Sequence, residues 1–309
     1  MPHKVLISDK IEAPCLEAFD KAGIAYDVSV GLAPEALEGI IGGYDAQVVR
    51  SATKVTERIL EKGRAGRLRC VARAGAGLDN IDVKAAERLG ITVFNTPGLN
   101  SNAVAELTVC LCMVLARKLG RAITSIKAGL WEKKSLAGTE VMGKTLGLIG
   151  FGHIGSLVAR KALGLGMGVL AHDPLVPADL IKEHGASPVD LEPLLSASDF
   201  VSLHLPVSGA TKGLIGRDTL KRFKEGAYLI NCARGGLVDE AALFEALSSG
   251  RLAGAAVDVF QSEPPGGSPL LALDNFVATP HIGASTLEAQ DGVARKVAEL
   301  VVGFLGGLA

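Results

Sequence analysis

The sequence has few aromatic residues, no surplus of either charge and no long apolar segment. Aromatic residues occupy 4% of the 309 positions, so the core is expected to be aliphatic. Lys and Arg number 32 against 33 Asp and Glu, which excludes a global electrostatic footprint for nucleic acid or an anionic membrane. The longest apolar run, residues 103–116, has 14 residues, short of the ~20 that span a bilayer. It predicts a buried helix and no membrane partner.

The chain also has no pattern typical of a signal peptide and no cysteine spacing typical of disulfides or metal sites. No charged segment followed by an apolar stretch opens it, so we expect no signal peptide and a cytoplasmic location. Its five cysteines are scattered and include no Cys-x-x-Cys. That spacing fits neither a disulfide framework nor a zinc site, and we expect buried free thiols and no metal.

What the sequence does contain is typical of a two-domain α/β protein. Apolar residues make up 48% and charged residues 21%, which excludes wholesale disorder, and 309 residues suggest about two domains. Short β-branched runs alternate with helical patterns, which favours parallel sheets wound with helices. The predicted strands are 5–8, 25–30, 46–49 and 69–72, then 145–150, 168–172, 200–204, 227–231, 254–259 and 276–279. The predicted helices include 14–22, 34–41, 56–63, 83–89, 103–118 and 286–305.

The strongest single motif is a glycine-rich turn with its full structural context. Gly150, Gly152 and Gly155 follow a predicted strand and open a predicted helix, and Asp173 closes the next strand. This βαβ pattern is the dinucleotide fingerprint. The glycines allow a tight turn, close backbone approach to a pyrophosphate and close helix packing, while the helix N-terminus faces the anion. Asp173 would bond ribose hydroxyls and repel a 2′-phosphate, which predicts NAD as the cofactor.

Three polar residues follow later strands of the same series. Arg234, Glu263 and His281 are distant in sequence, but the carboxyl ends of strands in a doubly wound sheet converge on one crevice. A His oriented by a carboxylate can donate and accept a proton, and Arg is a planar clamp for a carboxylate. Together they indicate an enzyme that acts on a small acid.

At these residues the chain resembles the D-isomer-specific 2-hydroxyacid dehydrogenases over essentially its whole length. The catalytic segments carry the general resemblance. Arg50-Ser-Ala-Thr-Lys54 and Trp131-Glu-Lys-Lys134 point within the family to a phosphorylated substrate, 3-phosphoglycerate. The other matching segments are residues 73–79, 95–97, 138–140, 231–236, 258–260, 263–265 and 280–286.

The resemblance implies two doubly wound parallel-sheet domains, with a Rossmann NAD-binding domain inserted in a flavodoxin-like substrate domain. The substrate-binding domain would comprise residues 1–98 and 284–309, and the NAD-binding domain residues 99–283. The family implies an active site in the cleft between them. It also implies a homodimer built largely through the cofactor domains.

The resemblance also assigns roles by position. His281 would be the acid–base residue, Glu263 its partner and Arg234 the holder of the substrate carboxylate and 2-oxygen. Asp258 would bind the nicotinamide carboxamide, and His204 with Pro206 would border adenine and ribose, although His204 could equally be an ordinary strand-end residue. The complete cofactor set is Gly150, Gly152, His153, Ile154, Gly155, Asp173, His204, Pro206, Cys232, Ala233, Arg234, Asp258 and His281.

Substrate contacts are expected from other segments. Backbone amides around Gly75–Gly77 resemble the family's carboxylate cradle, and Asn100 lines the same cleft. Arg50 and Arg73 would bind the phosphate, with Lys133 and Lys134 approaching from the neighbouring subunit. The complete substrate set is Arg50, Arg73, Gly75, Ala76, Gly77, Asn100, Lys133 and Lys134.

Two departures from the family and two alternative functions bear on this interpretation. Position 153 is His where phosphoglycerate dehydrogenases often have Arg near the pyrophosphate. Because the sequence ends at Ala309, we expect no C-terminal regulatory domain of the kind that longer relatives have. The nearest alternative is a glyoxylate or hydroxypyruvate reductase or another D-2-hydroxyacid dehydrogenase, which shares fold and trio. A non-catalytic NAD(H)-sensing scaffold is a different class, which the intact trio disfavours.

Overall fold

The computed structural model describes residues 3–307, which form two compact α/β units. One unit contains the described residues up to Asn100 together with those from Ser285 onward, and the other is Ser101–Ala284. Each unit is built on one sheet, and every strand pair in both sheets is parallel. Two parallel-sheet α/β domains are therefore confirmed.

The first unit has a five-stranded sheet of order β2-β1-β3-β4-β5. This order is the flavodoxin-like arrangement, whose ligand crevice lies where the winding reverses, between β1 and β3. The last strand was not predicted from the sequence, because it has three residues and lies at the sheet edge without a fully buried side chain. The strands are β1 (Lys4–Ile7), β2 (Ala25–Val28), β3 (Ala46–Val49), β4 (Cys70–Arg73) and β5 (Thr92–Phe94).

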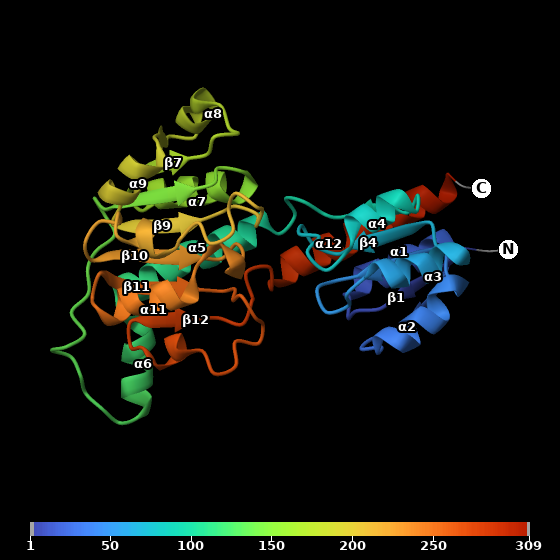
Figure 1. The fold of residues 1–309 in the computed structure, drawn as a ribbon, viewed down its shortest axis with the longest axis horizontal. Helices are drawn as coiled ribbons and strands as arrows, with labels where there is room; N and C mark the ends of the chain where they lie inside the picture. Colours follow the sequence, from blue (N-terminus) through green and yellow to red (C-terminus); the bar gives the residue numbers. More distant parts are fainter. Residues whose placement is uncertain (1–2, 308–309) are drawn as a thin grey trace. The chain divides into compact units, whose positions relative to one another are not determined.

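Helices cover both faces of this sheet. On one face, Phe19 and Val297 pack on Ile7, so the C-terminal helix shares a core with the first helix of the chain (Figure 1). On the other face, Ile59 packs against strand residues such as Leu6. The helices are α1 (Ala13–Ala22), α2 (Pro34–Ile40), α3 (Glu57–Ala65), α4 (Val83–Arg88) and α12 (Leu287–Gly306), with a 3₁₀ turn at Ile41–Gly43.

The second unit has a seven-stranded sheet of order β12-β11-β10-β9-β6-β7-β8. If the strands are renumbered from 1 at β6 and the order is read from β8, the sheet is 3-2-1-4-5-6-7. This is the dinucleotide-binding arrangement 3-2-1-4-5-6 with one further strand at the edge. Its short edge strand β8 was not predicted. The strands are β6 (Thr145–Ile149), β7 (Gly168–His172), β8 (Ser187–Pro188), β9 (Phe200–Leu203), β10 (Ala227–Asn231), β11 (Leu252–Val257) and β12 (Phe276–Ala278).

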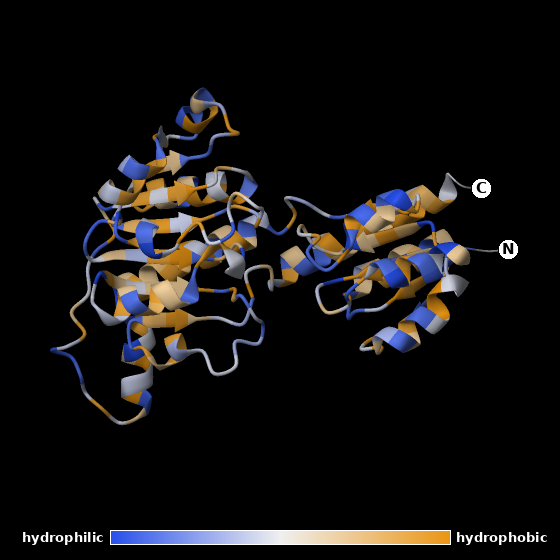
Figure 2. Cartoon of the chain, in the orientation of Figure 1, coloured by the Kyte–Doolittle hydropathy of each residue, from blue (hydrophilic) through white to orange (hydrophobic). Residues whose placement is uncertain are grey.

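The central strands of this unit are almost wholly apolar, because helices cover both faces (Figure 2). The predicted apolar helix is confirmed as α5, which is largely buried. Within residues 3–307, none of the helices is long and apolar enough to cross a membrane. The helices are α5 (Ser101–Ala116), α6 (Leu119–Lys127), α7 (His153–Gly164), α8 (Ala178–Glu183), α9 (Leu191–Ala197), α10 (Arg217–Leu220) and α11 (Glu240–Ser248), with 3₁₀ turns at Gly235–Leu237 and Pro269–Ala272.

Candidate active site

The glycine fingerprint forms the turn between β6 and α7. Gly150 has φ +97°, and a Cβ there would lie 2.5 Å from the carbonyl oxygen of His204. A Cβ on Gly155 would lie 2.4 Å from the carbonyl oxygen of Gly150, so the first turn of α7 packs directly on the strand end. A Cβ on Gly152 would meet nothing within 4 Å. Two of the glycines are thus required by internal packing, and the third leaves bare backbone at the helix N-terminus, as an incoming pyrophosphate requires.

Asp173 ties this turn to the end of the neighbouring strand. Its carboxylate accepts hydrogen bonds from the N–H of Phe151 at 2.8 Å and from the N–H of Leu175 at 2.9 Å. A carboxylate beside a bare glycine turn and a helix N-terminus fits a dinucleotide with a free 2′-hydroxyl. His153 is exposed at the first position of α7, and Ile154 is half-buried against the core.

His204 follows β9 and lies against the same turn. Its Nε2 is buried and has no hydrogen-bond partner among residues 3–307. Burial lowers the pKa of the His204 imidazole from 6.5 to about 3, so the ring is neutral at physiological pH. Pro206 is exposed, and its carbonyl accepts a hydrogen bond from the Thr211 hydroxyl at 2.7 Å. Contact of either residue with adenine or ribose stays a prediction.

His281 and Glu263 form a direct pair. The imidazole Nδ1 lies 2.8 Å from the carboxylate Oε2, and the other carboxylate oxygen accepts the N–H of Phe260 at 3.1 Å. Both side chains are partly exposed and border a cavity of about 400 Å³. The pair can therefore hold a proton within reach of a small molecule.

Asp258 fixes the segment that carries His281. Its side chain is 1% exposed. The Oδ1 atom accepts the Thr279 hydroxyl at 2.5 Å and the Ile282 N–H at 2.8 Å, and Oδ2 accepts the Gly283 N–H at 2.7 Å. His281 has φ +55°, a conformation that L-residues rarely adopt without such support. This anchoring role of Asp258 was not predicted from the sequence, in which Asp258 was expected only to bind the nicotinamide.

Arg234 stands in a turn after β10. The buried Asn231 shapes this turn, since its amide donates to the carbonyl of Arg234 at 2.9 Å and accepts the N–H of Ala233 at 3.1 Å. Cys232 and Ala233 are buried beneath it. Gly235 packs so closely on Phe260 that a Cβ would lie 2.0 Å from its carbonyl. The Arg234 turn therefore adjoins the segment that leads to Glu263.

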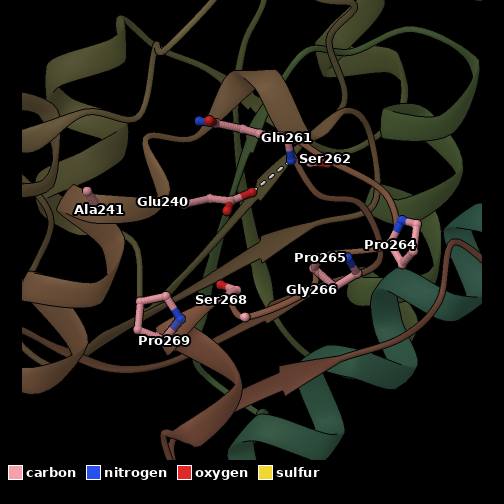
Figure 3. A pocket seen from close by; sticks show the side chains of 10 residues that line it. Glu240, Ala241, Gln261, Ser262, Pro264, Pro265, Gly266, Ser268 and Pro269 are labelled. Atoms are coloured by element: carbon pink, nitrogen blue, oxygen red, sulfur yellow. Dashed lines mark hydrogen bonds between the residues drawn. The ribbon is translucent and has the colours of Figure 1, made fainter.

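The segment that carries Glu263 is also held from α11. The Gln261 N–H donates to the carboxylate of Glu240 at 2.7 Å, and the Gln261 side chain donates to the carbonyl of Val238 at 2.7 Å. Glu240 and Gln261 line a second hollow of about 350 Å³ (Figure 3). Pro264 borders both this hollow and the His281 cavity.

In the five-stranded unit, the predicted substrate residues gather at the carboxyl ends of β3 and β4. Arg50 follows β3 and forms an ion pair with Glu12, Nη1 to Oε1, at 2.9 Å. Arg73 ends β4, and its guanidinium lies on the backbone of Gly75, where a Cβ would be 2.2 Å from Nη1.

Of the three backbone N–H groups in the predicted carboxylate cradle, those of two residues remain available to a ligand. The N–H of Gly75 donates to the buried Thr96 hydroxyl at 3.0 Å. Within residues 3–307, neither Ala76 nor Gly77 uses its N–H in a hydrogen bond. The cradle proposal therefore rests on Ala76 and Gly77. Asn100 is half-buried and directly precedes α5.

Lys133 and Lys134 are exposed in a turn after α6. Their neighbour Glu132 is bonded to Arg121, which also pairs with Asp274 at 2.5 Å. Asp274 precedes β12 and His281 follows it. Within one chain, this anchoring holds the lysine turn at the opposite end of β12 from His281. Among residues 3–307, no cluster of side chains suits a metal ion.

A dinucleotide-binding sheet whose carboxyl edge carries a His–Glu pair and an Arg is an arrangement suited to nucleotide-dependent oxidation and reduction. Residues 109–283 match the model of the D-isomer specific 2-hydroxyacid dehydrogenase NAD-binding domain. The chain belongs to this family. The seven-stranded unit contains the family's NAD-binding domain, which identifies NAD as the cofactor.

Individual relatives are similar over nearly the whole chain. The D-3-phosphoglycerate dehydrogenase of Methanocaldococcus jannaschii is 43% identical over 98% of the chain, and the chain spans 58% of that protein's length. The hydroxypyruvate reductase of Thermotoga maritima is 46% identical, covering 98% of the chain and 99% of that protein. The crystal structure of a glyoxylate reductase from Paecilomyes thermophila has a TM-score of 0.87 at 31% identity, covering 97% of this chain and 94% of that one.

Proposed function

We propose that this chain oxidises 3-phospho-D-glycerate to 3-phosphohydroxypyruvate with NAD, as a cytoplasmic homodimer that serves serine biosynthesis. The observation that carries the catalytic part is the 2.8 Å contact between His281 Nδ1 and Glu263. The proposed substrate rests on Arg50 and Arg73 at the ends of adjacent strands and on the similarity to D-3-phosphoglycerate dehydrogenases.

The His–Glu contact decides which imidazole nitrogen reacts. In the neutral ring, Nδ1–H donates to the Glu263 carboxylate, so Nε2 carries the lone pair. Nε2 therefore takes the proton of the C2 hydroxyl in oxidation and returns it in reduction, and Glu263 stabilises the imidazolium in between. The bound nicotinamide supplies the hydride acceptor.

Other residues of the seven-stranded unit orient the two reactants. Arg234 holds the substrate carboxylate and 2-oxygen in a planar clamp, which fixes C2 for transfer. The bare turn at Gly152 and the α7 N-terminus hold the pyrophosphate, and Asp173 holds the adenosine ribose.

The five-stranded unit supplies the remaining contacts in this proposal. The N–H groups of Ala76 and Gly77 bind the carboxylate, and Arg50 and Arg73 bind the phosphate. Lys133 and Lys134 are assigned to the phosphate bound by the second subunit. The homodimer is supported by apolar side chains exposed before these lysines, including Ile123, Ile126 and Trp131, which is 81% exposed.

A hydroxypyruvate reductase is the second candidate, and two observations favour it. The Thermotoga relative matches 98% of this chain and 99% of its own length. Arg50 is paired with Glu12, which offsets part of the positive charge that a phosphate would need.

The deciding experiment compares two ketoacids that differ only in the phosphate. The oxidation of NADH is followed at saturating cofactor with phosphohydroxypyruvate and with hydroxypyruvate, and NADH formation is followed with 3-phosphoglycerate and NAD. A kcat/KM at least tenfold higher for the phosphorylated ketoacid supports the proposal. A preference for hydroxypyruvate would replace it with the reductase.

A further inference from the structure

One side-chain amide in the five-stranded unit contacts both candidate phosphate arginines. Asn80 Nδ2 donates to the carbonyl of Arg50 at 2.7 Å and to the carbonyl of Thr53 at 2.7 Å. Its Oδ1 accepts a hydrogen bond from Nε of Arg73 at 3.2 Å. The donor and acceptor sides of the amide are therefore divided between the loop after β3 and the guanidinium at the end of β4.

The opposite side of the same loop is held by Asp9, which follows β1 and is 4% exposed. Its carboxylate accepts the Arg50 N–H at 2.6 Å, the Thr53 N–H at 3.1 Å and the Thr53 hydroxyl at 2.7 Å. Asp9 thus binds the donors of the loop, and Asn80 binds its carbonyls. Residues 50–53 are fixed on both sides without any regular secondary structure of their own.

This arrangement lies at the crevice of the flavodoxin-like sheet, where the winding reverses between β1 and β3. A fixed loop backbone limits where the long Arg50 side chain can reach. The bond to Nε likewise restricts the Arg73 guanidinium, whose rotamer freedom is otherwise lost on binding an anion. Preorganisation of this kind raises affinity by lowering that cost.

We propose that Asn80 is a positioning residue that sets specificity for a phosphorylated substrate, by holding Arg50 and Arg73 as one anion-binding unit. The inference rests on the proposed function, because it takes the phosphate as the group that both arginines bind. Asn80 itself touches no reacting atom. Its removal acts on the affinity for the phosphate and leaves hydride transfer unchanged.

The test uses Asn80→Ala and the matched ketoacids phosphohydroxypyruvate and hydroxypyruvate. The KM for phosphohydroxypyruvate rises roughly tenfold, as expected when about three hydrogen bonds that orient charged groups are lost. The kcat on both substrates and the KM for hydroxypyruvate stay within about twofold. Inorganic phosphate serves as a competitive inhibitor of hydroxypyruvate reduction. Its inhibition constant rises by the same factor as the KM for phosphohydroxypyruvate.

Asp82→Ala is the matched control. Asp82 is two residues away and caps α4 by accepting the Ala85 N–H at 3.0 Å, with no bond to either arginine. The Asp82→Ala substitution lowers the melting temperature and leaves the KM values for both ketoacids unchanged. If Asn80→Ala does not fold, Thr53→Val removes the 2.7 Å hydroxyl bond to Asp9 from the same loop and shows the same selective rise.

Equal KM increases on both ketoacids, or unchanged inhibition by inorganic phosphate, would overturn the role of Asn80. Failure of the proposed function looks different, because the unmodified protein then prefers hydroxypyruvate. In that case, phosphate inhibition of the Asn80→Ala protein still decides whether Asn80 organises an anion site.

Discussion

His281 and Glu263 are 18 positions apart in sequence, yet the imidazole Nδ1 lies 2.8 Å from the carboxylate. They meet because the segments after β11 and β12, which are neighbouring parallel strands, both emerge at the same edge of the sheet. The hydrogen bonds from Thr279, Ile282 and Gly283 to Asp258 fix the His281 segment against this edge. The orientation of the His281 imidazole is therefore set by backbone anchoring as well as by its carboxylate partner.

Removing the proposed base should abolish turnover without abolishing cofactor binding. We expect His281→Ala to lower kcat by about 10²- to 10⁴-fold, the usual contribution of a positioned acid–base group. Glu263→Gln keeps the shape and loses the charge, so its kcat should fall less. Steady-state kinetics give kcat, and NADH fluorescence titration gives the cofactor affinity. A His281→Ala protein with nearly unchanged kcat would remove His281 from the mechanism.

Gly152 and Gly155 should respond differently to the same substitution. Gly155→Ala places a Cβ 2.4 Å from the Gly150 carbonyl, and we expect a loss of about 1–3 kcal/mol of unfolding free energy from overpacking. Gly152→Ala meets open space, so its stability should be unchanged while its affinity for NADH falls. Urea unfolding and NADH titration measure the two effects. Equal NADH affinity in Gly152→Ala and the unmodified protein would contradict the assignment of that turn.

Asp173 should determine the preference for NAD over NADP. The residue also bonds two backbone N–H groups, so Asp173→Asn is the informative change: it retains one acceptor oxygen and loses the charge that repels a 2′-phosphate. We expect the ratio of kcat/KM for NAD to that for NADP to fall by about tenfold, equivalent to 1.4 kcal/mol. A ratio that does not move would show that another group excludes the phosphate.

His204, whose Nε2 is buried without a hydrogen-bond partner among residues 3–307, should make the fold less stable in mild acid. Its pKa is lowered from 6.5 to about 3 by burial, so the unfolded chain binds a proton that the folded chain does not. The stabilising contribution is complete above pH 6.5 and is lost as the pH falls toward 3, by up to about 1.4 kcal/mol per pH unit. Urea unfolding at pH 7.5 and pH 5 measures the difference. His204→Gln should show a smaller loss between these values, and an equal loss would assign the acid sensitivity to other groups.

Much of this molecule is determined by local sequence pattern. The glycine fingerprint, the strand before it and the acid after the next strand are contiguous signals whose geometry depends on one βαβ unit. The alternation of apolar runs with amphipathic helices likewise predicts two parallel sheets, because such strands must be covered on both faces. Short edge strands such as β5 and β8 escaped prediction, since they bury too little to show a pattern.

Only the tertiary structure decided how the polar residues are partnered. No spacing in the sequence indicates that Asp258 anchors the His281 segment, that Glu12 pairs with Arg50, or that Asn80 joins two arginines. These contacts link the ends of different strands, and their distances depend on register and loop backbone rather than on residue type. The sequence alone therefore determined the class of fold and the cofactor turn. The tertiary structure decided which donors and acceptors remain available to a substrate. It brings distant segments together, and the chain then uses some of their polar groups for its own hydrogen bonds.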